Sequence, residues 1–241
     1  MNWIQGNLDT ITSNLVAHVW LSIPPIVISF LLSVPIGLLV SRLRRRRGAA
    51  ARATGSTIVV VASLLYAIPS FPFFLALPAI LGTSILDPVN VVIALTVYGI
   101  ALMARSAADA IDAVDVEVVR ASEALGYSPA QRFFRVELPL SGPVLLAGIR
   151  VVAVSTVSLV TVGALLGIPN LGFLLTDGLK RGISVEIITG IVLTIVLALV
   201  IDGLLVLIGR LVMPWTRGPG RAARSVRRAA AREVRTEGAS A

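Results

Sequence analysis

Few side chains in this 241-residue sequence are suited to catalysis. There is no cysteine, which excludes disulfides, thiolate metal sites and cysteine nucleophiles. The single histidine, His18, lies in an apolar segment, where a packed or interfacial ring is expected. The single lysine, Lys180, is followed by Arg181, and no Gly-x-x-x-x-Gly-Lys-Ser/Thr phosphate-binding loop occurs. We therefore expect no catalytic residue, no metal site and no cofactor in this chain.

Polar side chains inside apolar segments are the remaining candidates for chemistry. Asp202 lies about 10 residues before the C-terminal end of the last apolar segment, which corresponds to about 15 Å at a helical rise of 1.5 Å per residue. Two interpretations stay open: a protonated or hydrogen-bonded aspartate at a helix or dimer contact, or part of a cation path. Ser155 and Thr161 either line a translocation path or hydrogen-bond within the helices.

A helix break is predicted at the segment Ile68-Pro69-Ser70-Phe71-Pro72, because two prolines remove backbone donors. Broken backbone at membrane depth is tolerated only where it is buried or lines a cavity. Ser70 is then the polar side chain best placed to contact a solute, unless the kink is purely structural. The nearby aromatic side chains either close such a path and offer cation–π surfaces, or simply pack. The candidate path comprises Ser70, Phe71, Phe73, Phe74, Ser155, Thr161 and Asp202.

The composition indicates that these residues sit in a membrane. The chain is 56% hydrophobic and 14% charged with a mean hydropathy of +0.91, whereas soluble domains have about 25% charged residues. A helix needs about 20 apolar residues to cross a bilayer. We predict an all-α membrane bundle of about five transmembrane helices, at residues 14–40, 57–81, 89–103, 144–166 and 187–212.

The distribution of basic residues predicts the orientation. With the N-terminus outside, 19 of the 21 basic residues face the cytoplasm, and only Lys180 and Arg181 lie outside. We expect a multi-pass plasma-membrane protein with a short extracytoplasmic segment (residues 1–13), a transmembrane domain (14–212) and a basic cytoplasmic tail (213–241). The tail either binds anionic lipid or is disordered, and nucleic acid is not an expected partner.

The polar insert between the third and fourth spans, residues 106–140, predicts a cytoplasmic helical hairpin. Gly126 is suited to end the first helix in a left-handed conformation. Ser128, Pro129 and Gln131 have the spacing of a capping box that starts a second, short helix ending before Pro139. Acidic residues such as Asp109 and Asp112 suit the start of the first helix. Its apolar stripe is too large for the hairpin to bury and comprises Ile111, Val114, Val118, Ala121 and Leu125.

The hairpin resembles the EAA signature of ATP-binding-cassette importer permeases, since Ala121, Gly126 and the Leu138-Pro139 pair have the spacing of that motif. Arg120 stands where the family has its leading glutamate. The resemblance implies a type I importer permease fold and a coupling helix that contacts a cytoplasmic ATPase, which carries ATP and Mg. It also implies a second permease copy or sister permease and a separate extracytoplasmic binding protein. The predicted ATPase-coupling residues are Glu117, Ala121, Glu123, Gly126, Leu138 and Pro139.

A narrower resemblance concerns the solute. His18 with Leu21-Ser22, Ile68-Pro69-Ser70 and the run from Glu137 to Pro143 look like the glycine betaine, carnitine and choline importer permeases, although the Gly167 to Gly172 loop departs from them. The resemblance implies import of a small osmoprotectant such as glycine betaine, choline, carnitine or proline betaine. The alternatives are the same architecture importing an amino acid or other small organic solute, and an ion-coupled secondary transporter that uses Asp202.

Overall fold

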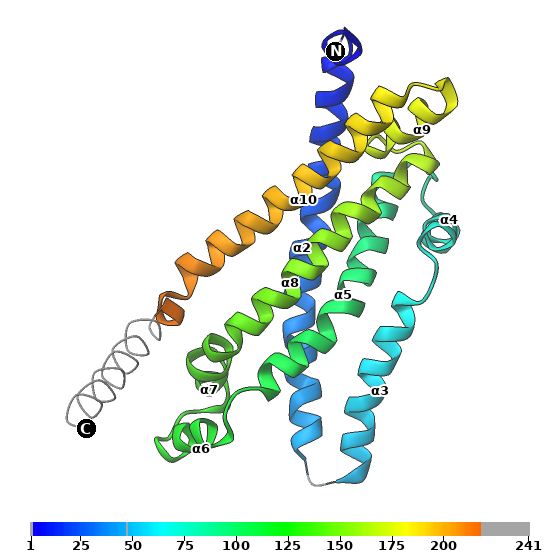
Figure 1. Ribbon diagram of the computed structural model, residues 1–241. Helices are drawn as coiled ribbons and strands as arrows, with labels where there is room; N and C mark the ends of the chain where they lie inside the picture. The colour runs from blue at the N-terminus through cyan, green and yellow to red at the C-terminus, as the bar shows by residue number, and fades with distance from the viewer. Residues whose placement is uncertain (1, 47, 218–241) are drawn as a thin grey trace, which may run out of the picture.

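The computed structural model describes residues 2–46 and 48–217, and every regular element in these ranges is helical. Five helical segments in the described ranges are long and apolar enough to cross a membrane (Figure 1). They are α2 (Leu8–Arg45), α3 (Ala49–Tyr66), α5 (Pro88–Asp112), the Pro129–Leu166 segment that contains α8 (Leu138–Val160), and α10 (Ser184–Val212). The predicted all-α bundle of about five spans is therefore confirmed.

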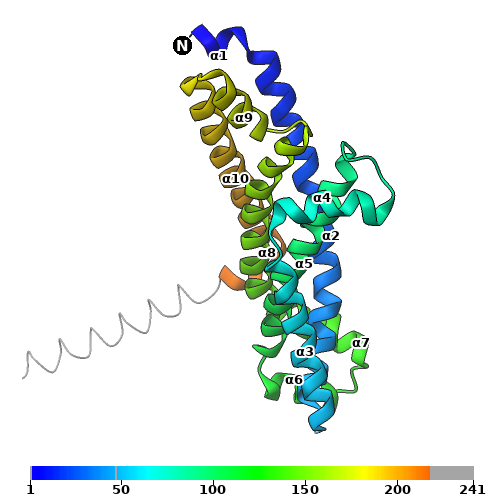
Figure 2. The ribbon, with the colours of Figure 1, turned by 90° about the vertical axis from the view of Figure 1, so that its right-hand side faces the viewer.

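The short elements gather at the two ends of the bundle. Helices α1 (Asn2–Gly6) and α9 (Gly172–Arg181) lie at one end, which we call the α9 end (Figures 1 and 2). Helices α6 (Val116–Ala124) and α7 (Pro129–Arg132) lie at the opposite end with the last turn of α2 and the start of α3, and we call it the α6 end. The predicted basic tail falls mainly in residues 218–241, outside the described residues; its start forms a 3₁₀ turn at Pro214–Arg217.

The core forms where α5 packs along α2 and α8. Met103, Val152, Ala153 and Val157 are almost completely buried there. Small residues allow this close packing: a Cβ atom added to Gly37 would lie 2.6 Å from Cβ of Ala107. Close backbone approach through small residues is typical of packed membrane helices.

Helix α2 begins at Leu8, before the predicted first span, and continues through Pro24, Pro25 and Pro35. Prolines are tolerated in membrane helices because neighbouring helices and Ser/Thr side chains satisfy the freed backbone groups. Ser22 and Ser29 donate hydrogen bonds of 2.8 and 3.1 Å to backbone carbonyls within α2.

The break predicted over Ile68 to Pro72 is present but shorter, because α3 ends at Tyr66 and α4 (Ser70–Leu81) already starts at Ser70, so Pro72 lies in the first turn of α4. The phenol of Tyr98 donates a 2.7 Å hydrogen bond to the Ile68 carbonyl, which the break leaves without a helical donor. Helix α4 lies across the bundle, seen end-on in Figure 1 and from the side in Figure 2. The predicted second span is thus one long helix, α3, followed by a short crosswise helix.

The predicted start of the first helix and the predicted end of the second helix in the 106–140 insert are wrong. The first helix does not begin at Ser106, because α5 runs on to Asp112 and Asp115 starts the separate helix α6 by accepting a 2.8 Å hydrogen bond from Glu117 N. The second does not end before Pro139, because α7 continues through a π-helical turn (Phe133–Glu137) into α8. Pro139 lies just after the π-helical turn, where the regular α-helical hydrogen bonding is already interrupted, and this accommodates its missing N–H group.

Candidate functional site

The turn between α6 and α7 has the local structure that its residues predict. Gly126 has a φ of 80°, the left-handed conformation that glycine adopts most easily. Ser128 Oγ accepts from Gln131 N at 3.3 Å, and Gln131 Oε1 accepts from Ser128 N at 2.9 Å, so the predicted capping box is present. Residues 113–137, which we call the α6–α7 hairpin, therefore have a bend that Gly126 and the capping box define.

Arg132 links the two arms of the hairpin through two carboxylates. Its guanidinium contacts Glu123 of α6, and its Nε lies 3.0 Å from Glu137 Oε1. The Glu137 side chain is almost completely buried, and a buried charge is stable only when it is paired. Arg132 thus fixes α6 relative to the start of α8. Glu123 was predicted to contact an ATPase, and here it has a partner within the chain.

A second charged cluster attaches the end of α5, directly before the hairpin, to α2. Arg44 lies 3.1 Å from Asp109 and 3.0 Å from Asp112, and the Ser41 hydroxyl donates to Asp112 at 2.5 Å. Asp109 and Asp112 were predicted at the start of a helix, but they lie in the last turn of α5. Negative charge is unfavourable beside a helix C-terminus, and the arginines of α2 compensate for it.

The hairpin exposes apolar side chains at the α6 end. Leu125 is 77% exposed and Phe134 is 65% exposed, and Val116 and Val118 of α6 are exposed as well. Of the predicted stripe, Ile111 and Val114 are buried instead, because the chain bends between α5 and α6. The predicted coupling residues divide similarly: Glu117, Ala121, Glu123 and Gly126 are exposed on the hairpin, whereas Leu138 and Pro139 are partly buried at the start of α8. An apolar surface of this kind is typical of a protein contact site.

The aromatic residues near the break do not share one surface. Ser70 is partly buried at the first position of α4, and Phe71 is exposed. Phe73 packs edge-on against Tyr98 with ring centroids 5.6 Å apart. Phe74 is fully buried in an apolar cluster with Leu21 and Leu77, so it does not face an open path in this structure.

Asp202 and Ser155 lie together in a groove between α8 and α10. The groove has a volume of about 680 Å³. Asp202 accepts two hydrogen bonds from Arg150, Nε to Oδ1 at 2.6 Å and Nη2 to Oδ2 at 2.7 Å. Local sequence patterns do not reveal this partner, because the two residues are 52 positions apart. Thr161 is outside the groove, and its hydroxyl donates to the Ser158 carbonyl at 2.6 Å.

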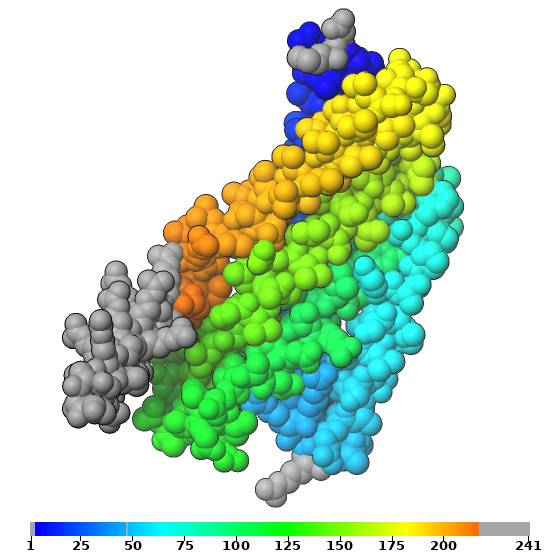
Figure 3. Space-filling view, in the orientation of Figure 1, coloured from blue at the N-terminus to red at the C-terminus, as the bar shows by residue number. Residues whose placement is uncertain are grey.

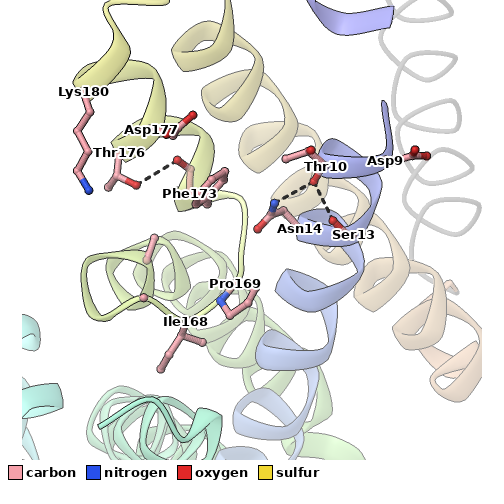
Figure 4. Close-up of a pocket in the computed structure, with 12 residues that line it drawn as sticks. Asp9, Thr10, Ser13, Asn14, Ile168, Pro169, Phe173, Thr176, Asp177 and Lys180 are labelled. Atoms are coloured by element: carbon pink, nitrogen blue, oxygen red, sulfur yellow. Dashed lines mark hydrogen bonds between the residues drawn. The ribbon is translucent and has the colours of Figure 1, made fainter. Parts of the chain in front are cut away.

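A second cavity, of about 810 Å³, opens at the α9 end and was not predicted. Thr10, Ser13 and Asn14 of α2 face Thr176 and Lys180 of α9 across it (Figure 4). Helix α9 falls within residues 167–185, for which only a loop was expected. A connection of that length without secondary structure is unusual in a compact domain. The length of the 167–185 connection is therefore the feature of the sequence that could have indicated a helix there.

His18 is a packed residue, as predicted. Its ring is fully buried, with Nε2 3.0 Å from the Val157 carbonyl and Nδ1 accepting from Leu171 N at 3.2 Å. The proton therefore resides on Nε2, and the ring joins α2 to α8 and to the segment before α9. Among residues 2–46 and 48–217, no group of three or more His, Cys, Asp or Glu side chains is arranged to hold a metal ion.

Comparisons with known proteins agree with this geometry. Residues 8–217 match the family described as "Binding-protein-dependent transport system inner membrane component". The chain is 26% identical over 214 residues to the choline transport system permease protein OpuBB of Bacillus subtilis, covering 89% of this chain and 94% of that protein. It is 26% identical over 208 residues to the osmoprotectant import permease protein OsmW of Salmonella typhimurium, covering 85% and 93% of the two chains.

The fold is also that of a solved transporter. A chain of the MetNI methionine ABC transporter, in an inward-facing conformation, is similar with a TM-score of 0.75 at 22% sequence identity. The similarity covers 86% of this chain and 98% of that one. The bundle is therefore the fold of an ABC importer permease.

Proposed function

We propose, on the premise that this chain belongs to the family of binding-protein-dependent transport system inner membrane components, that it carries a small osmoprotectant across the membrane in an ATP-driven importer. As the permease component it is not itself catalytic. Choline and osmoprotectants are named for two relatives that match most of the chain, and this supports the same solute class here.

The α6–α7 hairpin is the observation that carries the proposal. It presents Leu125 and Phe134 to solvent, while Arg132 and the Arg44 cluster hold it in one orientation. A rigid apolar projection supports docking into a cleft of a cytoplasmic ATPase, because its movement would be transmitted directly into α5 and α8. ATP and Mg would bind that ATPase and not this chain.

The α6 end is then the cytoplasmic end. The arginine-rich segment from Arg42 to Arg46 lies at this end, whereas Lys180 and Arg181 belong to α9 at the other. This arrangement follows the positive-inside rule and supports an extracytoplasmic N-terminus and a cytoplasmic C-terminus. A binding protein would deliver solute at the α9 end, and a second permease copy or sister permease would complete the membrane unit.

Reconstitution tests the proposal. The chain, its ATPase and its binding protein are placed in proteoliposomes, and uptake of radiolabelled glycine betaine, choline and methionine is measured. We expect uptake of glycine betaine or choline only when ATP and the binding protein are both present. Uptake of methionine alone would support the amino-acid alternative. Uptake driven by a proton or sodium gradient without ATP would contradict the proposal and favour a secondary transporter.

A further inference from the structure

The Arg150–Asp202 ion pair lies in the middle of the membrane-spanning part. Arg150 is 12 residues after the start of α8, and Asp202 is 10 residues before the end of α10, which places them about 18 and 15 Å inside those helices. The two helices run side by side on one face of the molecule (Figure 3). Neither charge is close enough to a helix end to reach the membrane surface easily.

The pair is nevertheless open to its surroundings. The Arg150 side chain is 43% exposed and the Asp202 side chain is 21% exposed. Charged side chains at this depth face the interior of an assembly or a water-filled cavity, because lipid cannot solvate them. The face formed by α8 and α10 around this pair is therefore directed toward water or another protein.

The groove beside the pair has the size and lining of a small-molecule site. Its volume of about 680 Å³ falls within the usual range for ligand pockets, roughly 300–1,000 Å³. Apolar side chains such as Ala198 and Leu199 line most of it, and Ser155, Ser158 and Thr194 add hydroxyl groups. An apolar wall with a few polar groups beside two opposite charges fits a small solute that carries both signs.

We propose that this groove binds a zwitterionic solute, with the carboxylate on Arg150 and the cationic nitrogen beside Asp202; this inference rests on the proposed function. The guanidinium offers Nε and Nη2 as a fork, which matches a carboxylate, as its contact with Asp202 already shows. A zwitterion can separate the pair and still leave each charge with a partner. A solute with a single charge leaves either Arg150 or Asp202 unpaired at membrane depth, which is unfavourable.

The charge requirement gives a directional test. Uptake of glycine betaine, a zwitterion, and choline, a cation, is measured in proteoliposomes that contain the ATPase and saturating binding protein. Because the same binding protein serves every variant, its own selectivity cancels when uptake ratios are compared. Arg150→Gln should lower the ratio of glycine betaine to choline uptake about tenfold, and Asp202→Asn should raise it. Arg181→Gln, which removes an exposed ion-pair partner on α9, should leave the ratio unchanged.

A purely structural ion pair predicts a different result. Both single variants would then lower uptake of the two solutes by the same factor. The exchanged pair, Arg150→Asp with Asp202→Arg, would restore uptake of both solutes. An unchanged ratio of glycine betaine to choline uptake in the single variants overturns the inference. If the unmodified complex moves neither solute, the proposed function is wrong and the inference falls with it. If it moves glycine betaine but every variant keeps the original ratio, only the inference fails.

Discussion

Arg132 and Glu137 form an ion pair across the π-helical turn, with Nε 3.0 Å from Oε1 and the Glu137 side chain 5% exposed. The same arginine contacts Glu123 of α6, so three residues join both arms of the hairpin to the start of α8. This geometry makes the hairpin and α8 a single mechanical unit. A force applied to α6 by a partner would therefore move the helix that carries Arg150.

Removing Arg132 should loosen that unit. Arg132→Met leaves Glu137 buried without its partner, and a change of this kind costs about 3–5 kcal/mol. We expect a lower melting temperature of the purified protein and weaker retention of the ATPase on affinity resin. Arg181→Met is the control, because the Arg181–Asp177 pair lies on α9 at the opposite end, has its arginine 54% exposed and is worth at most about 1 kcal/mol. Equal behaviour of the two variants would show that Arg132 does not fix the hairpin.

Local patterns in the sequence were sufficient for much of this architecture. Hydropathy identifies membrane spans because lipid requires long apolar helices. Gly126 and the Ser128–Gln131 capping box depend on only a few neighbouring residues, so their spacing predicts their conformation. The break before Ser70 was predictable for the same reason, since proline acts on the adjacent backbone.

Features set by distant contacts were not predictable in this way. The apolar spacing of Ile111, Val114 and Val118 continues across the end of α5, and only Asp115 marks the start of a new helix. The contact between Arg44 and Asp112 helps to hold the end of α5 and joins residues 68 positions apart. The sequence marks Asp202 as an unusual intramembrane charge, but its partner Arg150 is one of the 19 basic residues that the charge count places on the cytoplasmic side.

The orientation can be tested with single cysteines, because the chain contains none. Lys180→Cys, at an exposed position of α9, should react with an impermeant maleimide applied to intact cells, and Arg46→Cys should react only after the membrane is opened. The reverse labelling pattern would show that the proposed orientation in the membrane is wrong.

Helix α4 allows its path and packing roles to be separated. Phe74→Ala should reduce the amount of folded protein, because truncating a fully buried phenylalanine costs about 3–5 kcal/mol. Ser70→Gln, at the partly buried start of α4, should leave the amount unchanged but abolish glycine betaine uptake if Ser70 lines the path. Uptake per molecule and the amount of membrane-inserted protein are both measured. Unchanged uptake per molecule in Ser70→Gln would exclude Ser70 from the path.

The turn at Gly126 gives the sharpest test of coupling, because the chain provides a matched position. Gly126 and Gly82 have φ values of 80° and 69°, and a Cβ atom added to either meets nothing within 4 Å. Valine therefore introduces similar backbone strain at both sites without a clash, since β-branched residues strongly disfavour positive φ. Only Gly126 lies in the hairpin at the α6 end.

We expect Gly126→Val to lower ATP-dependent glycine betaine uptake at least about tenfold, a loss equivalent to about 1.4 kcal/mol of coupling, while the protein stays in the membrane. Gly82→Val should retain most of the uptake. Gly126→Asn should recover part of it, because asparagine adopts the left-handed conformation more readily than valine. Uptake and solute-stimulated ATP hydrolysis are measured in the same proteoliposomes. Normal stimulation in Gly126→Val, or equal losses in Gly82→Val, would mean that the bend of the hairpin is not what transmits ATP hydrolysis to the membrane helices.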